Sequence, residues 1–464
     1  MALIKSISGI RGTIGGKPNE GLSPLDIVKF TSAFAAFLQK RHQKKNISII
    51  IGRDARISGE MVNHLVVGTL MGMGVDVIDT GFSTTPTVEM DVIHTKTSGG
   101  IILTASHNPM QWNALKLLNE KGEFINDREG KEVLTLAENE DFTFAEVSLL
   151  GKYSLHRNSI ENHIEKIRQL PLVDVEAIRK KKFRIAIDCV NSTGGIAIPL
   201  LLKALGVDDI VELYCVPDGV FAHNPEPLAE NLTEIAKTVP QQRCDLGIVV
   251  DPDVDRLALV CENGEMFGEE YTLVAVADYV LSHTKGNTVS NLSSSQALRD
   301  ITLKHGGTYT AAAVGEVNVV EAMKKTDAVI GGEGNGGVIY PELHYGRDAL
   351  VGIALFLTHL AKTNLSISDL RKTYPEYHIS KNKIELTPDI DVDMILKHIA
   401  KLHADKQINT IDGVKIDFGN EWVHLRKSNT EPIIRIYSES LSLKKANQLA
   451  EMIKQDIKTC AENK

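Results

Sequence analysis

Short apolar runs alternate along this chain with segments of helical periodicity. Runs rich in β-branched residues predict buried strands. The expected strands lie at residues 46–51, 100–103, 184–188, 246–250 and 328–330. Helical spacing follows two of them, at residues 60–71 and 196–205. Because apolar strands that alternate with helices are typical of parallel sheets covered on both faces, the pattern predicts an α/β fold.

The C-terminal part follows a different pattern. Residues 414–418 alternate between apolar and polar, residues 419–421 predict a turn, and residues 422–426 run back, which indicates an antiparallel hairpin. A further strand is expected at residues 433–437 and a helix at residues 444–460. We therefore predict a small α+β domain there, and breaks near residue 155 and after Arg256 divide the preceding α/β part.

Composition limits the possible functions. The 464 residues are 43% hydrophobic and 24% charged, with a formal net charge of -9, which suits a soluble protein of three or four domains. The negative charge argues against nucleic acid or an acidic membrane surface as a partner. The 5 cysteines form no C-x-x-C pair, and no signal peptide or long apolar run is recognised. We expect reduced thiols, no membrane span and a cytoplasmic location.

The segment Thr104-Ala-Ser-His-Asn-Pro109 follows the strand expected at residues 100–103. Ligands of such sheets bind beyond the carboxyl ends of the strands, so Ser106 is the best candidate for a reactive hydroxyl. We expect the side chain of His107 to point away from it, as neighbours do in extended backbone. The chain has no G-x-S-x-G elbow, H-E-x-x-H motif or P-loop, which argues against acyl transfer.

Three carboxylates follow another buried strand, at Asp251, Asp253 and Asp255. Such close like charges repel one another unless a cation neutralises them, and Mg²⁺ prefers oxygen ligands. An EF-hand does not fit, because the distal glycine and glutamate of that loop are missing. We predict a Mg²⁺ site with Arg256 beside it to contact a bound phosphate; a solvated acidic turn is the alternative.

A later loop concentrates groups that bind phosphate. Guanidinium, hydroxyl and amide donors beside exposed backbone N–H groups suit a phosphate dianion. An ordinary polar turn is the alternative. The predicted phosphate-binding residues of this loop are Arg426, Ser428, Asn429, Thr430 and Arg435.

The run Gly332-Glu-Gly-Asn-Gly-Gly337 matches G-x-G-x-x-G. We reject a dinucleotide site, because Pro341 falls where the helix of that motif would begin. Glu333 and Asn335 suit sugar hydroxyls better, and a glycine-rich turn without a ligand is the alternative.

Other charged residues carry less specific signals. Arg53, Asp54, Arg56 and Ser58 follow the first expected strand and either position a ligand or form a structural salt-bridge network. Lys116 could reach back to Ser106, although an isolated lysine is usually exposed to solvent.

A serine, a Mg²⁺ site and a separate phosphate site together indicate phosphoryl transfer, which relies on positioning and charge neutralisation. The serine, aspartate, glutamate–glycine and arginine segments also follow the order found in the α-D-phosphohexomutases. The chain resembles that family over its whole length, and it is most similar to the archaeal-type phosphoglucosamine mutases.

The resemblance implies three similar α/β domains with mainly parallel mixed sheets, and a C-terminal α+β domain, around a central active-site cleft. These domains would carry the phosphoserine, the metal, the sugar and the distal phosphate in turn. Their expected bounds are residues 1–155, 156–258, 259–373 and 374–464.

The resemblance also implies roles for the site residues. Ser106 would be a phosphoserine that shares Mg²⁺ with the three aspartates, and a hexose 1,6-bisphosphate would form and reorient. Glu333 and Asn335 would bind the sugar, and the loop from Arg426 to Arg435 the non-reacting phosphate. Three residues are expected to be catalytic beside Ser106, with the first and last of them as candidates for proton transfer: Arg11, His107 and Lys116.

Two departures from the family pattern bear on the substrate. Pro252 and Val254 stand where glycine is usual, and Asn335 and Gly337 stand where the sugar loop commonly has serine and histidine. A role for that histidine cannot be carried over. Because the Glu-x-Asn-Gly-Gly form resembles the archaeal-type enzymes, we expect conversion of glucosamine 6-phosphate to glucosamine 1-phosphate, by a monomer or homodimer. A phosphomannomutase/phosphoglucomutase is the alternative; a silent sugar-phosphate binding protein and a Mg²⁺-dependent phosphatase are more distant ones.

Overall fold

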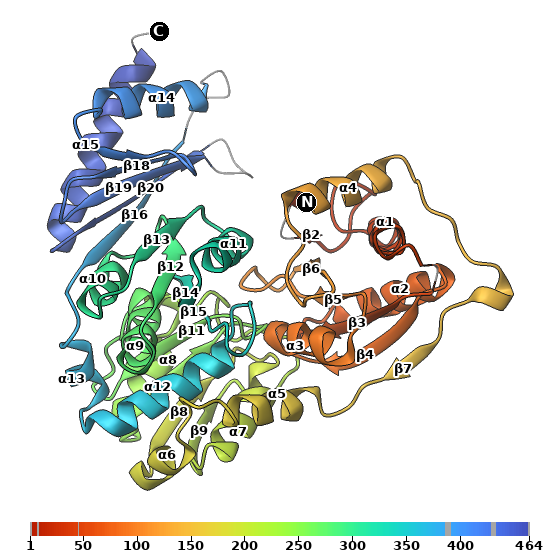
Figure 1. Ribbon diagram of the computed structural model, residues 1–464, viewed down its shortest axis with the longest axis horizontal. Helices are drawn as coiled ribbons and strands as arrows, with labels where there is room; N and C mark the ends of the chain where they lie inside the picture. The colour runs from red at the N-terminus through yellow and green to blue at the C-terminus, as the bar shows by residue number, and fades with distance from the viewer. Residues whose placement is uncertain (1, 7–8, 45, 386–390, 428–432, 463–464) are drawn as a thin grey trace. The chain divides into compact units, whose positions relative to one another are not determined.

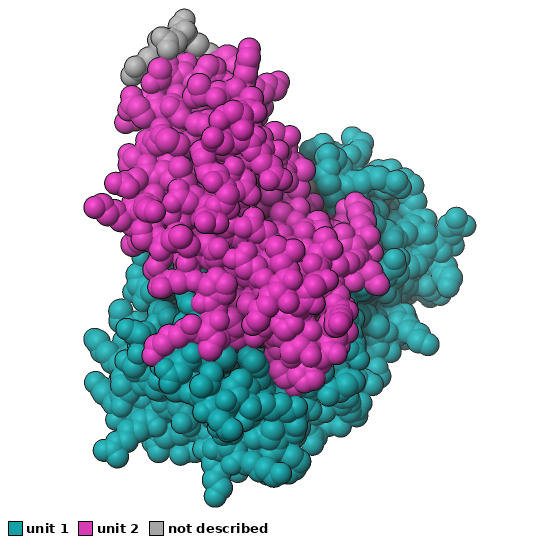
Figure 2. All heavy atoms as spheres, turned by 60° about the vertical axis from the view of Figure 1, so that its left-hand side comes forward, with its two compact units in different colours: residues 1–272, 335–371 teal, residues 273–334, 372–464 magenta. Residues whose placement is uncertain are grey.

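The computed structural model divides into two compact units, which Figure 2 colours separately. The first comprises residues 1–272 and 335–371, and the second residues 273–334 and 372–464. Figure 1 shows the helices and strands of both. The structure describes residues 2–6, 9–44, 46–385, 391–427 and 433–462.

A seven-stranded mixed sheet opens the first unit, with the order β1-β2-β6-β5-β3-β4-β7. The four strands β5, β3, β4 and β7 pair in parallel, whereas β1, β2 and β6 join through antiparallel pairs. The strands are β1 (Leu3–Ser6), β2 (Gly9–Thr13), β3 (Ser48–Arg53), β4 (Asp76–Phe82), β5 (Gly99–Leu103), β6 (Trp112–Leu118) and β7 (Tyr153–Leu155).

Helices bury both faces of this sheet (Figure 1). Ile49 and Ile51 belong to a core shared with α1, α2 and α4, whereas Ile50 packs with Val88 and Val92 of α3. This burial on both sides explains the uninterrupted apolar run of β3. The helices are α1 (Pro24–His42), α2 (Gly59–Gly72), α3 (Thr85–Thr95) and α4 (Asp127–Glu138), and the 3-10 turn η1 (Val147–Leu149) follows them.

A second sheet of the first unit has the order β11-β10-β8-β9, in which only β11 is antiparallel to its neighbour. Ile235 and Val239 of α8 pack on it against Ala186 and Val249. Its strands are β8 (Arg184–Asp188), β9 (Asp209–Leu213), β10 (Leu246–Val250) and β11 (Leu257–Cys261). The helices and the remaining strand of this part are α5 (Ser159–Arg168), α6 (Val175–Lys181), α7 (Gly194–Ala204), η2 (Ala229–Asn231), α8 (Thr233–Gln241), β15 (Gly337–Ile339), α12 (Ala349–Thr363) and α13 (Ile367–Arg371).

The second unit contains a parallel set, β13-β12-β14, and a five-stranded antiparallel sheet with the order β16-β20-β19-β18-β17. The parallel set consists of β12 (Asn287–Asn291), β13 (Tyr309–Ala312) and β14 (Ala328–Glu333) with α10 (Ala297–Lys304) and α11 (Glu316–Thr326), and α9 (Glu269–His283) leads into it. The antiparallel part consists of β16 (His378–Glu385), α14 (Val392–Leu402), β17 (Gln407–Asn409), β18 (Val414–Asp417), β19 (Trp422–Lys427), β20 (Ile433–Ser440) and α15 (Leu443–Glu462).

The predicted elements are confirmed within a few residues at their ends. The hairpin at residues 414–426 forms β18 and β19, and the three α/β arrangements precede an antiparallel α+β part, as expected. The exact domain bounds stay a prediction. None of the helices in the described part of the chain combines the length and apolar character needed to span a bilayer.

Candidate active site

Ser106 lies just beyond the carboxyl end of β5, in a turn held by hydrogen bonds from its own loop. Its backbone N–H donates to Thr104 Oγ1 at 2.9 Å, and the Thr104 hydroxyl donates to Asp54 Oδ2 at 2.6 Å. The φ angle of Ser106 is 48°, in the left-handed region that few residues other than glycine adopt. A backbone so constrained holds the hydroxyl in one direction.

Arg56 stabilises this turn through an ion pair and hydrogen bonds. It is 1% exposed and its Nε donates to Asp54 Oδ2 at 3.0 Å. Its two terminal nitrogens donate to three carbonyl oxygens of the serine loop and to the carbonyl of Trp112 at the start of β6. Two of these are the carbonyls of Ser106, at 2.5 Å, and Asn108, at 2.7 Å. Asp54 and Arg56 therefore form a buried ion pair whose hydrogen bonds hold the loop that carries Ser106.

The left-handed turn corrects one sequence-based expectation. His107 Nδ1 lies 3.4 Å from Ser106 Oγ, so the two side chains do not point apart. The expectation was wrong because it assumed extended backbone, which Ser106 does not have. Burial, and then the positive charge of Arg256, lower the pKa of His107 well below its ordinary value, which favours the neutral imidazole.

The three aspartates lie against this serine. Ser106 Oγ donates to Asp251 Oδ2 at 2.8 Å, across 145 positions of sequence. Asp251, Asp253 and Asp255 are each 0% exposed, and one carboxylate oxygen of each lies within 4.8 Å of the others. The structure thus brings together the predicted hydroxyl and the predicted metal ligands.

Cations and hydroxyls hold the outer oxygens of this triad. Lys116 Nζ, on β6, donates to Asp253 Oδ2 at 2.6 Å and lies 3.4 Å from Asp255 Oδ2. Burial penalises the charge of Lys116, but the two carboxylates outweigh that effect and raise its pKa. The ion pair lowers the pKa of Asp253 against the effect of burial. Lys116 therefore faces the aspartates, and the raised pKa favours its charged form.

The inner oxygens of the triad fit a cation. Asp253 Oδ1 and Asp255 Oδ1 are buried without a hydrogen-bond partner among the residues that the structure describes. Burial, followed by the charges of Asp255 and Asp253, raises the pKa of Asp251 well above its ordinary value. Unpartnered buried carboxylate oxygens are costly, and a hard divalent cation would compensate them. Asp251, Asp253 and Asp255 could therefore bind a metal.

Arg256 and Arg11 add positive charge to the same site. Arg256 Nε lies 3.9 Å from Asp255 Oδ1, and a terminal nitrogen lies 3.5 Å from Glu226 Oε1. Burial, and then the charge of Arg256, lower the pKa of Arg11 on β2. The charges of Arg11 and Arg256 therefore interact, and guanidinium groups are well suited to contact a phosphate.

The two predicted sugar-binding residues belong to different units. Glu333, in the second unit, is 5% exposed, and its Oε1 accepts from Asn291 Nδ2 at 2.9 Å and from the backbone of Gly315 at 3.1 Å. Asn335, in the first unit, accepts from the backbone of Gly337 at 3.3 Å. The glutamate carboxylate is thus fixed by donors on one oxygen.

The structure explains why one position of this run requires glycine. Gly336 has a φ angle of 83°, and a Cβ there would lie 2.2 Å from the carbonyl oxygen of Leu257. Its own carbonyl accepts from the Leu257 N–H at 3.1 Å. The close approach to β11 requires glycine, and the strand β15 that follows confirms that no helix opens here.

The predicted phosphate loop is described in part. Arg426 and Arg435 stand directly opposite each other on β19 and β20, and Arg426 Nε lies 3.1 Å from Asp412 Oδ2. Three further members of the predicted set lie outside the described residues, namely Ser428, Asn429 and Thr430.

Two site residues were not predicted from the sequence. Thr85, at the start of α3, donates to Asp253 Oδ2 at 2.5 Å, and Arg347 donates to Asp255 Oδ2 at 2.7 Å. Both stand at the start of a helix, and Arg347 directly precedes Asp348, the N-cap of α12. Each residue is only the neighbour of an N-cap, Thr84 or Asp348, and a polar residue at a helix start is too common a signal to point to a site.

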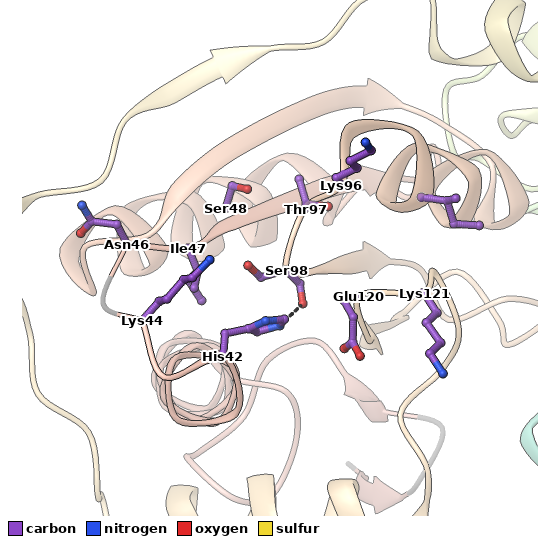
Figure 3. A pocket seen from close by; sticks show the side chains of 11 residues that line it. His42, Lys44, Asn46, Ile47, Ser48, Lys96, Thr97, Ser98, Glu120 and Lys121 are labelled. Carbon is purple, nitrogen blue, oxygen red and sulfur yellow. Dashed lines mark hydrogen bonds between the residues drawn. The ribbon is translucent and has the colours of Figure 1, made fainter.

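A pocket of about 650 Å³ lies elsewhere on the first unit (Figure 3). His42, Lys44, Lys96 and Lys121 line it, and the His42 ring is 3.2 Å from the carbonyl of Ser98. Ser98 precedes β5, so the pocket is at the opposite end of that strand from Ser106. It contributes nothing to the site described above.

Comparison with known proteins identifies the family. Models described as phosphoglucomutase/phosphomannomutase α/β/α domains I, II and III match residues 3–144, 161–264 and 268–377, and the model of the C-terminal domain matches residues 383–455. A phosphoglucomutase/phosphomannomutase of Thermococcus kodakarensis is 36% identical, over 95% of this chain and 96% of that protein. A phosphoglucosamine/phosphogalactosamine mutase of Sulfurisphaera tokodaii is 32% identical, over 98% of this chain and 99% of the relative.

The fold agrees with these matches. A phosphoglucomutase/phosphomannomutase family protein from Burkholderia thailandensis superposes with a TM-score of 0.84 at 24% identity, covering 98% of both chains. The domain models account for most of the chain in the expected order. This chain therefore belongs to the phosphoglucomutase/phosphomannomutase family, and it is an enzyme of the phosphohexomutase class.

Proposed function

We propose that this enzyme interconverts the 6-phosphate and 1-phosphate of a hexose through a phosphoserine at Ser106, and that the hexose is glucosamine. The observation that carries the mechanism is the 2.8 Å hydrogen bond from Ser106 Oγ to Asp251 Oδ2. In this bond Ser106, the predicted phosphoryl carrier, contacts the carboxylate triad. Two oxygens of the triad, Asp253 Oδ1 and Asp255 Oδ1, lack hydrogen-bond partners among the described residues.

The triad would hold Mg²⁺ together with the phosphate on Ser106. When bound there, Mg²⁺ would offset the negative charge of the transferring phosphoryl group. The contacts of Lys116 with Asp253 and of Arg347 with Asp255 fix the outer oxygens of these carboxylates. The inner oxygens stay available to the metal.

Each half-reaction is a phosphoryl exchange between two hydroxyls. The bond from Ser106 Oγ to phosphorus breaks, a new bond forms to a hydroxyl oxygen of the hexose phosphate, and a 1,6-bisphosphate results. The sugar hydroxyl loses a proton and Ser106 Oγ gains one, so protons balance. After the bisphosphate turns round, the reverse transfer returns its other phosphate to Ser106. Hexose 1,6-bisphosphate added from solution would activate an unphosphorylated enzyme in the same way.

We assign the proton transfer at the serine to His107, because its Nδ1 lies 3.4 Å from Ser106 Oγ. Geometry within hydrogen-bond reach is the first requirement for such a role. Lys116 is engaged by two carboxylates, so its contribution would be electrostatic. Arg11 remains the candidate for proton transfer on the side of the sugar hydroxyl.

The distal phosphate would bind the loop between β19 and β20. Like charges directly opposite each other in a sheet are destabilising, yet Arg426 and Arg435 occupy such a pair. An anion between the two guanidinium groups removes that repulsion and accepts hydrogen bonds from both. Ser428, Asn429 and Thr430 would add donors, and Arg256 would contact a phosphate near the triad.

Two features support glucosamine over other hexoses. The buried carboxylate of Glu333 is an acceptor suited to a 2-ammonium group, and Asn335 replaces the hydroxyl residue that is common at its position. The relative from Sulfurisphaera tokodaii also has a name that refers to amino sugars. The alternative is a phosphomannomutase/phosphoglucomutase, which the name of the Thermococcus kodakarensis relative favours.

One assay panel tests both parts of the proposal. The purified enzyme is supplied with Mg²⁺, a trace of hexose 1,6-bisphosphate and, in turn, glucosamine, glucose or mannose 6-phosphate, and its intact mass is measured before and after. We expect the largest kcat/KM with glucosamine 6-phosphate and a mass increase of one phosphate. A larger kcat/KM with glucose or mannose would replace the substrate, and turnover without any phosphoenzyme would reject the mechanism.

A further inference from the structure

A second cluster of metal-ligating side chains is buried in the first unit. His163 lies on α5, His344 lies in the segment before α12, and Asp348 is the N-cap of α12. They are 2%, 4% and 0% exposed. Neither the proposed mechanism nor the family-derived roles use any of the three.

The two imidazoles present the same type of atom to one oxygen. His163 Nε2 lies 3.1 Å from Asp348 Oδ2, and His344 Nε2 lies 3.4 Å from it. The ligand atoms of all three residues lie within 4.8 Å of one another. Bonds of about 2.0–2.1 Å to a tetrahedral metal ion separate its ligand atoms by about 3.3 Å, so the observed spacing fits such an ion.

The other nitrogen of each ring also has a polar neighbour, which is hydrogen-bonded to the ring in the case of His163 but not in the case of His344. His163 Nδ1 lies 3.0 Å from the hydroxyl of Thr87, and His344 Nδ1 lies 3.4 Å from Glu89 Oε2. Asp348 Oδ1 accepts from two backbone N–H groups of α12. Metal-binding histidines usually contact a hydroxyl, carbonyl or carboxylate through the second nitrogen.

The number of N–H groups that His344 can donate favours a metal ion, and not a proton, between the imidazoles and Asp348 Oδ2. A neutral imidazole has one N–H, whereas His344 faces a carboxylate oxygen at each ring nitrogen. If its proton lies on Nδ1 toward Glu89, a lone pair on Nε2 faces the negative Asp348 Oδ2. A metal ion at Nε2 turns that repulsion into two coordinate bonds.

We propose that His163 Nε2, His344 Nε2 and Asp348 Oδ2 bind a divalent transition-metal ion of the Zn²⁺ class, at a structural site separate from the aspartate triad. Two nitrogen donors and one oxygen select such an ion over Mg²⁺, which prefers oxygen alone. Three protein ligands leave one coordination position for water.

The position of the cluster suggests what it stabilises. Thr87 is two residues after Thr85, which donates to Asp253, and Asp348 directly follows Arg347, which donates to Asp255. The backbone N–H of Thr85 also donates to the Asp253 carbonyl at 2.8 Å. An ion at the cluster would fix α3, α5 and the start of α12, and so fix two side chains that hold the triad.

Metal content of the full-length wild-type enzyme is the first test. The protein is loaded with Zn²⁺ in the presence of excess Mg²⁺, dialysed, and analysed by inductively coupled plasma mass spectrometry. We expect about one equivalent of Zn²⁺ per chain. Replacement by Co²⁺ should give the intense visible absorption of tetrahedral cobalt bound to nitrogen. Less than about 0.1 equivalent, or an octahedral cobalt spectrum, would overturn the proposal without any variant.

Paired substitutions assign the ion to the cluster. His344→Gln and His163→Gln should each lower bound Zn²⁺ at least about tenfold, whereas Asp253→Asn, in the triad, should keep the full equivalent. Loss of Zn²⁺ from the Asp253 variant with retention in both histidine variants would contradict the assignment. If both histidine variants fail to fold, the cobalt spectrum of the wild type still decides. Because these readouts need no turnover, they stand apart from the proposed mutase reaction.

Discussion

The aspartate triad and the histidine cluster are alike in burial and different in chemistry. Each gathers three ligating side chains that are almost wholly buried. The triad consists of oxygen donors alone and faces Ser106 and Lys116, whereas the cluster has two imidazoles and faces Thr87 and Glu89. Cations and a hydroxyl therefore surround the aspartate triad, whereas hydrogen-bond acceptors surround the histidine cluster.

This difference separates a reactive site from a structural one. Carboxylates whose outer oxygens contact Lys116 and Arg347 keep inner oxygens that could bind a metal, which we propose is an exchangeable Mg²⁺. Buried imidazoles, one of them oriented by Thr87 through its second nitrogen, suit an ion that stays bound. Burial by itself therefore does not identify the catalytic centre; the groups around it do.

The largest effect is expected for Ser106→Ala. Removing the phosphoryl carrier should lower turnover at least about 10⁴-fold, while the Zn²⁺ content of the histidine cluster stays unchanged, because the serine side chain contacts the triad. A coupled assay with metal analysis measures both. Ser98→Ala, before the amino end of the same strand, serves as the control and should keep wild-type turnover. Near-wild-type activity of the Ser106 variant would reject the mechanism.

Asp253→Asn should weaken Mg²⁺ binding at the aspartate triad without affecting the histidine cluster. The amide removes one negative ligand and the ion pair with Lys116, so the Mg²⁺ concentration for half-maximal activity should rise at least about tenfold. A Mg²⁺ titration of initial rate measures this, with Asp209→Asn as an exposed control on β9. An unchanged titration would argue against the triad as the Mg²⁺ site.

Arg347→Gln and Asp348→Asn compare neighbouring residues that serve different clusters. The first loses a charged hydrogen bond to Asp255, worth about 1.5 kcal/mol, so kcat/KM should fall about tenfold with bound Zn²⁺ unchanged. The second should release Zn²⁺. Steady-state kinetics and metal analysis of both variants provide the measurement. Equal loss of Zn²⁺ in both would show that the two clusters are not separable.

The smallest effect concerns pH. Burial and the neighbouring carboxylates raise the pKa of Asp251 above its ordinary value of 3.8, so below that raised pKa the metal-free protein holds a proton which Mg²⁺ must displace. Affinity for Mg²⁺ should therefore increase with pH and level off above the raised pKa. The metal-free fold should lose stability as pH rises from the ordinary to the raised pKa, because its native state binds more protons there.

Calorimetric titrations in buffers of different ionisation enthalpy measure the coupling. We expect release of up to about one proton per Mg²⁺ below the raised pKa of Asp251. Affinity independent of pH, with no proton released, would contradict the location of that proton.

Much of the fold was predictable because its signals are local. The uninterrupted apolar run of β3 and the hairpin of β18 and β19 follow from periodicity over a few residues. The left-handed turn at Ser106 was not predictable, because it depends on Arg56, which reaches the loop from about 50 residues away. The expectation that His107 points away from Ser106 was wrong for the same reason, because it did not allow for this turn.

The sequence by itself determined the candidates for the chemistry: a serine after one buried strand, three aspartates after another, and two late arginines, Arg426 and Arg435, which the fold places on β19 and β20. Tertiary structure alone decided how they meet. Lys116 reaches Asp253 across 137 positions and Arg347 reaches Asp255 across 92, and His163 meets Asp348 across 185. Periodicity and loop composition report on neighbours in the chain, whereas these contacts arise when separate sheets and helices pack, so only the folded chain displays them.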